Sequence, residues 1–227
     1  MSENLVEVKH LQQYFPAGGM GKNKQYVQAV DDVSFAIRKG ETLGLVGESG
    51  CGKTTTGRTL LRLYEPTDGT IIYDGKVLFD KKEKIAVDML PYRRRMQIVF
   101  QDPGSSLNPY QDVRSILSLP LKVHNVVPKD QIDDKILEIL DMVELPPEFM
   151  YKSPNSIGGG EKQLVSIARA LCCNPKFIIL DEPTAVLTPQ ETDKLFAVLR
   201  NMHDAGKAVV IITHKMHEVE ALSDRVA

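Results

Sequence analysis

The sequence has 227 residues, of which 42% are hydrophobic, so it can form one large domain or two small ones with a real core. Its 28 basic and 30 acidic residues give a formal charge of −2, without the basic excess expected of a nucleic-acid binder. No apolar run approaches the roughly 20 residues that span a bilayer, and the first residues do not resemble a signal peptide. We therefore expect a cytoplasmic protein that does not bind nucleic acid and keeps its three cysteines reduced.

Two strands are expected near the N-terminus, at residues 5–9 and 30–37. The segment between them is expected to be a loop whose centre, residues 18–24, is flexible and polar. An aromatic ring beside this loop can stack on a nucleotide base, or it can plug the end of a strand, and both interpretations stay open. The aromatic residues that flank the loop are Tyr14, Phe15 and Tyr26.

Residues 47–54 read GESGCGKT and fit the phosphate-loop pattern G-x-x-x-x-G-K-[ST] at every required position. An apolar run suited to a buried strand precedes this loop, and a helix-compatible segment follows it. Glycines let backbone N–H groups approach a phosphate closely because they have no Cβ. We expect Lys53 to hold the β- and γ-phosphates of a nucleotide and Thr54 to place its hydroxyl group on Mg²⁺. The residues expected to contact the nucleotide here are Gly47, Glu48, Ser49, Gly50, Cys51, Gly52, Lys53, Thr54 and Thr55.

The middle of the chain predicts a hairpin, a strand and a helical insertion. Residues 70–79 carry the turn signal Asp74-Gly75, which is typical of a small antiparallel sheet. The arginines at 93–95 are interpreted as a solvated face, and the strand at 96–100 leaves Gln101 at its tip. Residues 113–143 are expected to be helical, with breaks at Pro120 and Pro128.

The last third of the chain carries more candidate site residues. Gly158, Gly159 and Gly160 precede a predicted helix, where they can offer N–H groups to an anion or simply form a tight turn. A buried strand at 177–180 ends in Asp181-Glu182, and neighbouring strand residues point to opposite sides. We therefore expect Asp181 to bind Mg²⁺ or its water and Glu182 to polarise an attacking water. A last strand, at 208–213, ends at His214, which can contact the γ-phosphate, although a single histidine is more often structural.

These motifs occur in the order found in the ATPases of ATP-binding cassette (ABC) transporters, and virtually the whole chain resembles that family. Residues 97–103 and 105–109, which read QIVFQDP and SSLNP, are similar to the oligopeptide, dipeptide and nickel importer subunits. Residues 183–190 and the pair His214-Lys215 are more like sugar or nucleoside importers. The resemblance thus implies ATP-driven transport, with peptide or nickel import favoured. Sugar or nucleoside import and a non-hydrolysing regulatory ATP-binding subunit are the alternatives.

The resemblance also implies a fold and a set of partners. The fold is α/β, a P-loop NTPase core of ABC type with a mostly parallel sheet flanked by helices, a small antiparallel β subdomain and a helical insertion. Residues 1–227 are expected to form one ATP-binding domain, with a RecA-like core at 1–102 and 174–227 and a helical subdomain at 103–173. The family normally starts another strand where the sequence stops, so we expect a domain truncated at its C-terminus. The implied partners are a second ABC ATPase subunit, transmembrane permease subunits and, indirectly, a solute-binding protein, at the cytoplasmic side of the cell membrane.

Roles for single residues follow from the same resemblance. The ligands are ATP, held by the phosphate loop, and Mg²⁺, held by Thr54, Gln101 and Asp181. Gln101 also senses the transmembrane subunit, Glu182 is the catalytic base and His214 is the switch. Phe15 is in register with the aromatic residue that stacks on adenine, with Tyr14 and Tyr26 as rivals.

The chain departs from the family at two motifs. The signature Leu-Ser-Gly-Gly-Gln is replaced at residues 157–161 by IGGGE, so Gly158 lacks a hydroxyl donor and Glu161 adds a negative charge. Thr188 stands where the family usually has aspartate. In this family two cassettes pair head to tail, and each ATP lies between one phosphate loop and the other chain's signature. We therefore expect a heterodimer with one hydrolytic site and one site that mainly holds ATP.

Overall fold

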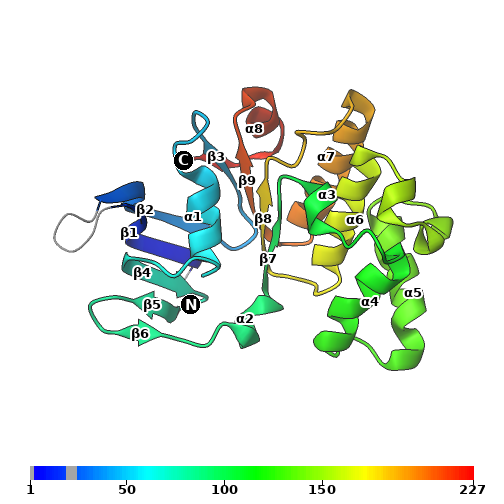
Figure 1. Cartoon of the computed structure of the whole chain (residues 1–227), viewed down its shortest axis with the longest axis horizontal. Coiled ribbons are helices and arrows are strands. Elements are labelled where there is room, and N and C mark those ends of the chain that lie inside the picture. Colours follow the sequence, from blue (N-terminus) through cyan, green and yellow to red (C-terminus); the bar gives the residue numbers. More distant parts are fainter. Residues whose placement is uncertain (1–2, 19–24) are drawn as a thin grey trace.

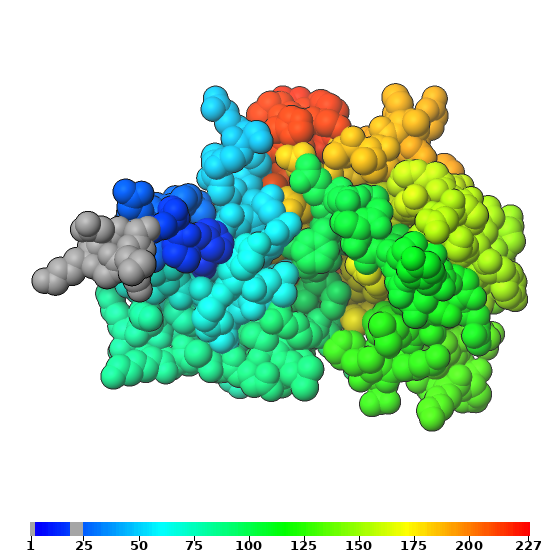
Figure 2. Space-filling view, in the orientation of Figure 1, coloured from blue at the N-terminus to red at the C-terminus, as the bar shows by residue number. Residues whose placement is uncertain are grey.

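The structure is a computed structural model of the chain, and it describes residues 3–18 and 25–227. The flexible loop expected at residues 18–24 lies, except for Gly18, outside these described residues. Two sheets lie beside a group of helices, and Figure 1 shows the antiparallel sheet and the helices α3–α6 (within residues 103–171) on opposite sides of the parallel sheet. Figure 2 shows the part of the chain that contains α3–α6, in green to yellow, side by side with the N-terminal part in blue to cyan. None of the helices in the described residues is long and apolar enough to cross a membrane.

The parallel sheet carries the motifs predicted from the sequence. Its strands, in spatial order, are β10 (Arg225–Val226), β3 (Thr42–Val46), β9 (Ala208–Thr213), β8 (Phe177–Asp181) and β7 (Met96–Val99). Every neighbouring pair is parallel, so the carboxyl ends of these strands meet at one edge. In an open α/β sheet this edge is where ligands bind. The expected α/β fold with a parallel sheet, an antiparallel sheet and helices is confirmed.

The antiparallel sheet is larger than the expected hairpin. It has the strand order β2 (Gln25–Arg38), β1 (Asn4–Gly18), β4 (Asp68–Tyr73), β5 (Lys76–Asp80) and β6 (Ile85–Ala86). The predicted turn is present, and both Asp74 (φ 48°) and Gly75 (φ 78°) have the positive φ that a tight hairpin turn requires. β1 and β2 extend well beyond the segments expected to be strands. Repeated shifts of register between these two strands interrupt the alternation of apolar and polar residues, so the sequence pattern shows only part of each strand.

The helices connect the strands. They are α1 (Lys53–Leu60), α2 (Leu90–Arg93), α3 (Pro103–Ser106), α4 (Val113–Val123), α5 (Ile132–Met142), α6 (Gly159–Leu171), α7 (Pro189–Asp204) and α8 (Met216–Leu222). Short 3₁₀ helices lie at Lys129–Gln131, Pro147–Tyr151 and Pro154–Ser156. The helices α3–α6 follow β7 and precede β8, as expected of an insertion.

Two expectations about the middle of the chain need correction, one at Pro120 and one at Arg93, whereas Arg94 and Arg95 are exposed as expected. Pro120 lies inside α4 and does not end it, because the burial of Leu117 and Leu121 offsets the roughly 3 kcal/mol that proline costs in a helix. Arg93 does not belong to a solvated face. Its guanidinium group donates to the carbonyl oxygens of Leu61 (2.5 Å) and Arg62 (3.2 Å), at the C-terminal end of α1, where carbonyl groups lack partners within the helix.

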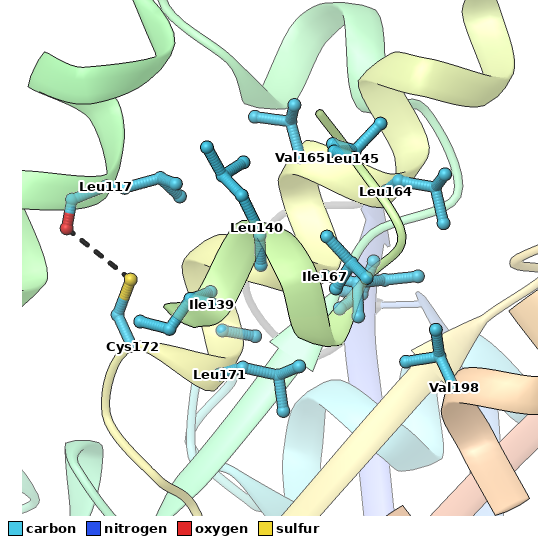
Figure 3. Packing of buried hydrophobic residues seen from close by; sticks show 14 of the residues in the cluster. Leu117, Ile139, Leu140, Leu145, Leu164, Val165, Ile167, Leu171, Cys172 and Val198 are labelled. Atoms are coloured by element: carbon cyan, nitrogen blue, oxygen red, sulfur yellow. Dashed lines mark hydrogen bonds between the residues drawn. The ribbon is translucent and has the colours of Figure 1, made fainter. Parts of the chain in front are cut away.

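The parallel sheet separates two hydrophobic cores. Side chains of β8 alternate between them, with Ile178 and Leu180 in the core shared with the helical insertion and Phe177 and Ile179 in the core shared with α1 and the antiparallel sheet. Figure 3 shows part of the first core, where the Cys172 thiol donates to the carbonyl oxygen of Leu117 at 3.4 Å. Burial raises the pKa of Cys172 to about 12, so this thiol stays protonated and unreactive, as expected of a packing residue.

Candidate functional site

A cavity of about 630 Å³ lies at the carboxyl edge of the parallel sheet, a volume within the range of small-molecule sites. Its walls come from β2, the loop before α1, the start of α1 and the segments that follow β7, β8 and β9. The lining residues are Val27, Gln28, Ala29, Ser49, Gly50, Cys51, Gly52, Lys53, Thr54, Thr55, Gln101, Glu182 and His214. The structure therefore brings the phosphate loop together with three of the residues predicted to act on the phosphates.

The phosphate loop is held closely against β2 and around Lys53. Gly52 has a φ of 98°, and a Cβ at this position would lie 2.1 Å from the carbonyl oxygen of Ala29, so only glycine fits here. The Lys53 side chain donates from Nζ to the carbonyl oxygens of Gly47 (2.7 Å) and Glu48 (2.8 Å). The loop thus surrounds the ammonium group, which lies at the start of α1, where free backbone N–H groups also favour an anion.

Asp181 lies at the end of β8 on the side that faces α1, because it continues the alternation of Phe177 and Ile179. Its Oδ1 accepts a hydrogen bond of 2.7 Å from the Thr54 hydroxyl group, and its buried Oδ2 has no hydrogen-bond partner among the described residues. Burial raises the pKa of Asp181, and the bond from Thr54 only partly opposes this effect. A buried carboxylate oxygen without a partner, next to a hydroxyl group, fits the oxygen ligands that Mg²⁺ prefers.

Glu182 directly follows β8 and has partners from two neighbouring segments. Gln101 donates from Nε2 to Glu182 Oε2 at 3.1 Å, and His214 Nδ1 lies 3.3 Å from Glu182 Oε1. Both carboxylate oxygens are therefore oriented by side chains that follow β7 and β9. The backbone of Glu182 has a φ of 44°, an uncommon conformation for a non-glycine residue that is often found at functional sites.

The signature glycines lie outside this cavity, at the N-terminus of α6. From the sequence, the N–H groups of these glycines could bind an anion or simply belong to a tight turn. In the structure the Gly158 N–H donates to Oε2 of Glu161, one turn along the same helix, at 2.8 Å. Glu161 therefore caps the helix from within and occupies a donor that an anion would use.

Thr188, the other departure from the family pattern, is the N-cap of α7. Its hydroxyl group accepts a hydrogen bond from the Glu191 backbone N–H at 3.4 Å, and the Glu191 carboxylate accepts bonds from the backbone N–H (2.8 Å) and the hydroxyl group (2.9 Å) of Thr188. This reciprocal arrangement is a capping box. Threonine, like the aspartate that is usual in the family, is a good N-cap residue, but it carries no negative charge.

None of the three aromatic candidates for base stacking is among the residues that line the cavity. Phe15 is half-buried and packs edge-on against Tyr64, with ring centroids 5.2 Å apart. Tyr14 donates from its hydroxyl group to Asp31, and Tyr26 is exposed. The choice among them stays a prediction.

The wall of the cavity formed by Val27, Gln28 and Ala29 of β2 was not predicted from the sequence. Val27 is 55% exposed, in the part of the edge strand β2 where residues 25–28 are all exposed. No local pattern could identify these residues. They reach the site only because β2 lies against the phosphate loop, through the close contact between Ala29 and Gly52.

Comparisons with known proteins agree with this geometry. Residues 30–185 match the family model described as ABC transporter. The chain is 40% identical, over its whole length and 72% of the relative, to the oligopeptide transport ATP-binding protein OppF of Bacillus subtilis. It is 39% identical, over 99% of its length and 68% of the relative, to the oligopeptide transport ATP-binding protein AppF of the same organism. It also superimposes with a TM-score of 0.83 on a dimeric, post-hydrolysis structure of the ATP-binding cassette MJ0796 bound to ADP and Pi, with 29% identity over 97% of this chain and 92% of that one. The chain therefore belongs to the ABC transporter family, as an ATP-hydrolysing cassette.

Proposed function

We propose that this chain powers the import of peptides, as one ATPase subunit of an importer at the cytoplasmic side of the cell membrane. Support comes from relatives that are named for oligopeptide transport and match nearly the whole chain. The single observation that carries the ATPase part of the proposal is the position of Glu182 at the cavity that the phosphate loop lines, with Gln101 and His214 bonded to its carboxylate oxygens.

In this proposal the phosphate loop binds the triphosphate of ATP, and Lys53 exchanges its bonds to the loop carbonyls for bonds to the β- and γ-phosphates. Glu182 accepts a proton from the water that attacks the γ-phosphate, since a carboxylate held from both sides is a suitable general base. His214 and Gln101 keep the carboxylate turned toward that water. Phe15 remains our candidate for adenine stacking.

Mg²⁺ is proposed as the metal, with Thr54, Asp181 and Gln101 as the residues that hold it directly or through water. The unpartnered Asp181 Oδ2 supports this assignment. When bound, the ion neutralises negative charge on the phosphates during transfer. The described residues contain no group of three or more His, Cys, Asp or Glu side chains placed to hold a metal, which agrees with an ion held mainly by the nucleotide and a few oxygens.

The proposed partners are a second cassette, permease subunits and a solute-binding protein. A cassette pair is supported by the position of Gly158 and Gly159, which lie outside the chain's own cavity and are exposed at the N-terminus of α6. Gln101 also lines a second cavity, of about 580 Å³, between α1 and the helices α3 and α6. A side chain that reaches both cavities is suited to report the nucleotide state to a permease. We also propose that the domain is divided into a core, residues 1–102 and 174–227, and a helical subdomain, residues 103–173.

The test is reconstitution of the transporter encoded with this chain into lipid vesicles, with ATP on the cassette side. We expect ATPase activity to rise with the solute-binding protein loaded with peptide. Sugar, nucleoside and Ni²⁺ are supplied in parallel, and stimulation by one of these alone would replace peptide as the solute. Absence of any ATP hydrolysis, with ATP binding intact, would favour a regulatory ATP-binding subunit.

A further inference from the structure

A buried carboxylate is hydrogen-bonded to the segments that carry the proposed catalytic residues. Glu218, on α8, is 1% exposed, and both of its oxygens are engaged. Oε1 accepts a hydrogen bond from the Thr184 hydroxyl group, and Oε2 accepts one of 2.8 Å from the Thr213 hydroxyl group. Lys215 Nζ lies 3.3 Å from Oε1 and supplies the opposite charge. A buried carboxylate lowers the stability of a protein unless it is paired with a positive charge and hydrogen-bonded, so the fold must hold all of these partners in place.

Each oxygen of Glu218 holds a segment that carries a proposed catalytic residue. Thr184 follows Glu182 by two residues, and Thr213 directly precedes His214. Lys215 joins the same two segments. Its Nζ donates to the hydroxyl group (2.9 Å) and the carbonyl oxygen (3.3 Å) of Thr184, and its backbone N–H donates to the Thr213 hydroxyl group at 3.1 Å.

The backbone pairing of β8 with β9 ends before the segments that this network joins. β8 and β9 are already paired up to Asp181 and Ile212, and the Glu182 N–H extends the pairing by one bond to the Ile212 carbonyl oxygen at 2.8 Å. Beyond that point the ladder between the two strands stops. Glu182 and His214 lie in this region, and their direct contact is the single side-chain approach of 3.3 Å. The bonds to Glu218 continue the connection between the two segments where backbone pairing has ended.

We propose that Glu218 is a positioning residue for ATP hydrolysis, which fixes the Glu182 segment to the His214 segment through Thr184 and Thr213. The inference rests on the proposed roles of Glu182 and His214. It assigns a function to a residue that is not among those that line the cavity. Misplacement of a catalytic group by about 1 Å costs about 100-fold in rate, so loss of such a positioning residue should lower turnover more than nucleotide binding.

The experiment measures kcat and KM for ATP in the complete transporter, and the melting temperature and nucleotide affinity of each variant. Thr184→Val removes the hydroxyl group and keeps the shape, and Glu218→Gln removes the charge and keeps the size. Glu220→Gln is the matched control, because Glu220 is an exposed carboxylate on the same helix. We expect kcat to fall about 10-fold or more in Thr184→Val and Glu218→Gln, with KM within about 2-fold, and to stay at the parental value in Glu220→Gln.

Two further measurements separate positioning from a merely structural role. Thr184→Ser keeps the hydroxyl group and should retain more of kcat than Thr184→Val. The imidazole resonances of His214 in a labelled sample should shift in Glu218→Gln and not in Glu220→Gln. The inference is overturned if kcat per folded molecule is unchanged in Thr184→Val and Glu218→Gln, whatever happens to their melting temperatures.

A Glu182→Gln variant distinguishes this failure from failure of the proposed function. If Glu182→Gln hydrolyses ATP at the parental rate, the proposed role of Glu182 is wrong and the inference falls with it. If Glu182→Gln abolishes hydrolysis while the Glu218 and Thr184 variants remain fully active, only the inference is wrong.

Discussion

Lys53 is 8% exposed, and its ammonium group bonds to carbonyl groups of its own loop. A triphosphate offers this cation stronger, charged acceptors in the same place. We predict that Lys53→Ala weakens ATP binding by about 10- to 100-fold, since a hydrogen bond to a charged group contributes roughly 1.5–3 kcal/mol. Equilibrium titration with ATP checks this, with the exposed Lys76→Ala as control. Parental affinity in a folded Lys53→Ala variant would refute the phosphate-loop assignment.

A substitution at Glu182 should affect ATP hydrolysis without affecting ATP binding. Glu182→Gln keeps the size and one acceptor oxygen, which can hold the bond from Gln101, but replaces the other oxygen by an NH2 group and so removes the carboxylate that takes the proton. We predict that kcat falls by about 10²- to 10⁴-fold, the usual contribution of a general base, while ATP affinity is retained. Steady-state ATPase measurements and ATP titration of the same preparation provide the comparison. Parental turnover would mean that another group is the base.

The buried carboxyl group of Asp181 should lower the stability of the folded chain when no cation is bound nearby. Burial raises the folded-state pKa of this carboxyl group above its ordinary value of 3.8, so its ionisation opposes folding as the pH rises through that raised pKa and remains unfavourable at neutral pH. We predict that Asp181→Asn, which keeps an acceptor for Thr54, raises the melting temperature of the nucleotide-free chain at pH 7 by a few degrees. In a chain of this size about 1 kcal/mol corresponds to ~2–4 °C.

The same variant should lose the extra stabilisation that Mg²⁺ adds to ATP. The measurement compares thermal shifts with ATP in Mg²⁺ and with ATP in EDTA. The exposed Asp193→Asn is the control and should behave like the parent in both respects. A Mg²⁺-dependent shift of parental size in Asp181→Asn would argue against Asp181 as a metal-binding residue.

At the scale of the elements, α6 and α7 meet at the signature. A Cβ on Gly160 would lie 2.0 Å from Oε1 of Glu191, whereas a Cβ on Gly159 would make only ordinary contacts, the closest at 3.6 Å. Glu191 cannot move freely, because its carboxylate belongs to the capping box of α7. The packing of α6 against α7 therefore leaves no room for a Cβ at Gly160 but leaves room for one at Gly159.

We predict that Gly160→Ala lowers the free energy of unfolding by about 1 kcal/mol, the usual cost of a lost N-cap. Gly159→Ala should be neutral or stabilising, because alanine is preferred over glycine in a helix by up to ~1 kcal/mol. Urea unfolding of the two variants makes the comparison. Equal stabilities would show that Glu191 leaves its position without cost.

At the scale of the whole molecule, the departures from the family pattern are unevenly distributed. The residues at the chain's own cavity match the expected pattern, whereas the signature carries Glu161, which already occupies the Gly158 N–H. We hypothesise a heterodimer in which this chain's phosphate loop, facing a partner's standard signature, forms the hydrolytic site. The other site, facing residues 157–161 of this chain, mainly holds ATP.

We predict that Lys53→Ala abolishes most of the ATPase activity of the assembled transporter, whereas replacement of the equivalent lysine of the partner cassette spares much of it. The measurement is steady-state ATPase activity of each assembly at saturating ATP. Glu161→Gln should raise the residual activity when Lys53 is replaced, because it removes the negative charge beside the phosphates. Equal losses in the two lysine variants, or a fully active homodimer of this chain, would contradict the hypothesis.

The sequence by itself determined the local motifs. The phosphate loop, the hairpin turn at Asp74-Gly75 and the Asp181-Glu182 pair depend on backbone conformations and residue types that neighbours in sequence specify, and the order of these motifs identified the fold class. Asp181 and Glu182 do have different contacts, but Glu182 lies just beyond β8 with a φ of 44°, so the alternation of strand residues does not by itself account for them.

Only the tertiary structure decided which distant residues meet. The β2 wall of the cavity, the use of Arg93 at the end of α1 and the buried network of Glu218 depend on contacts between segments far apart in the chain. The continuation of α4 through Pro120 likewise depends on burial against the rest of the insertion, which outweighs the local preference of proline. Such outcomes follow from the sum of packing and desolvation over the whole molecule, a quantity that a single stretch of sequence does not contain.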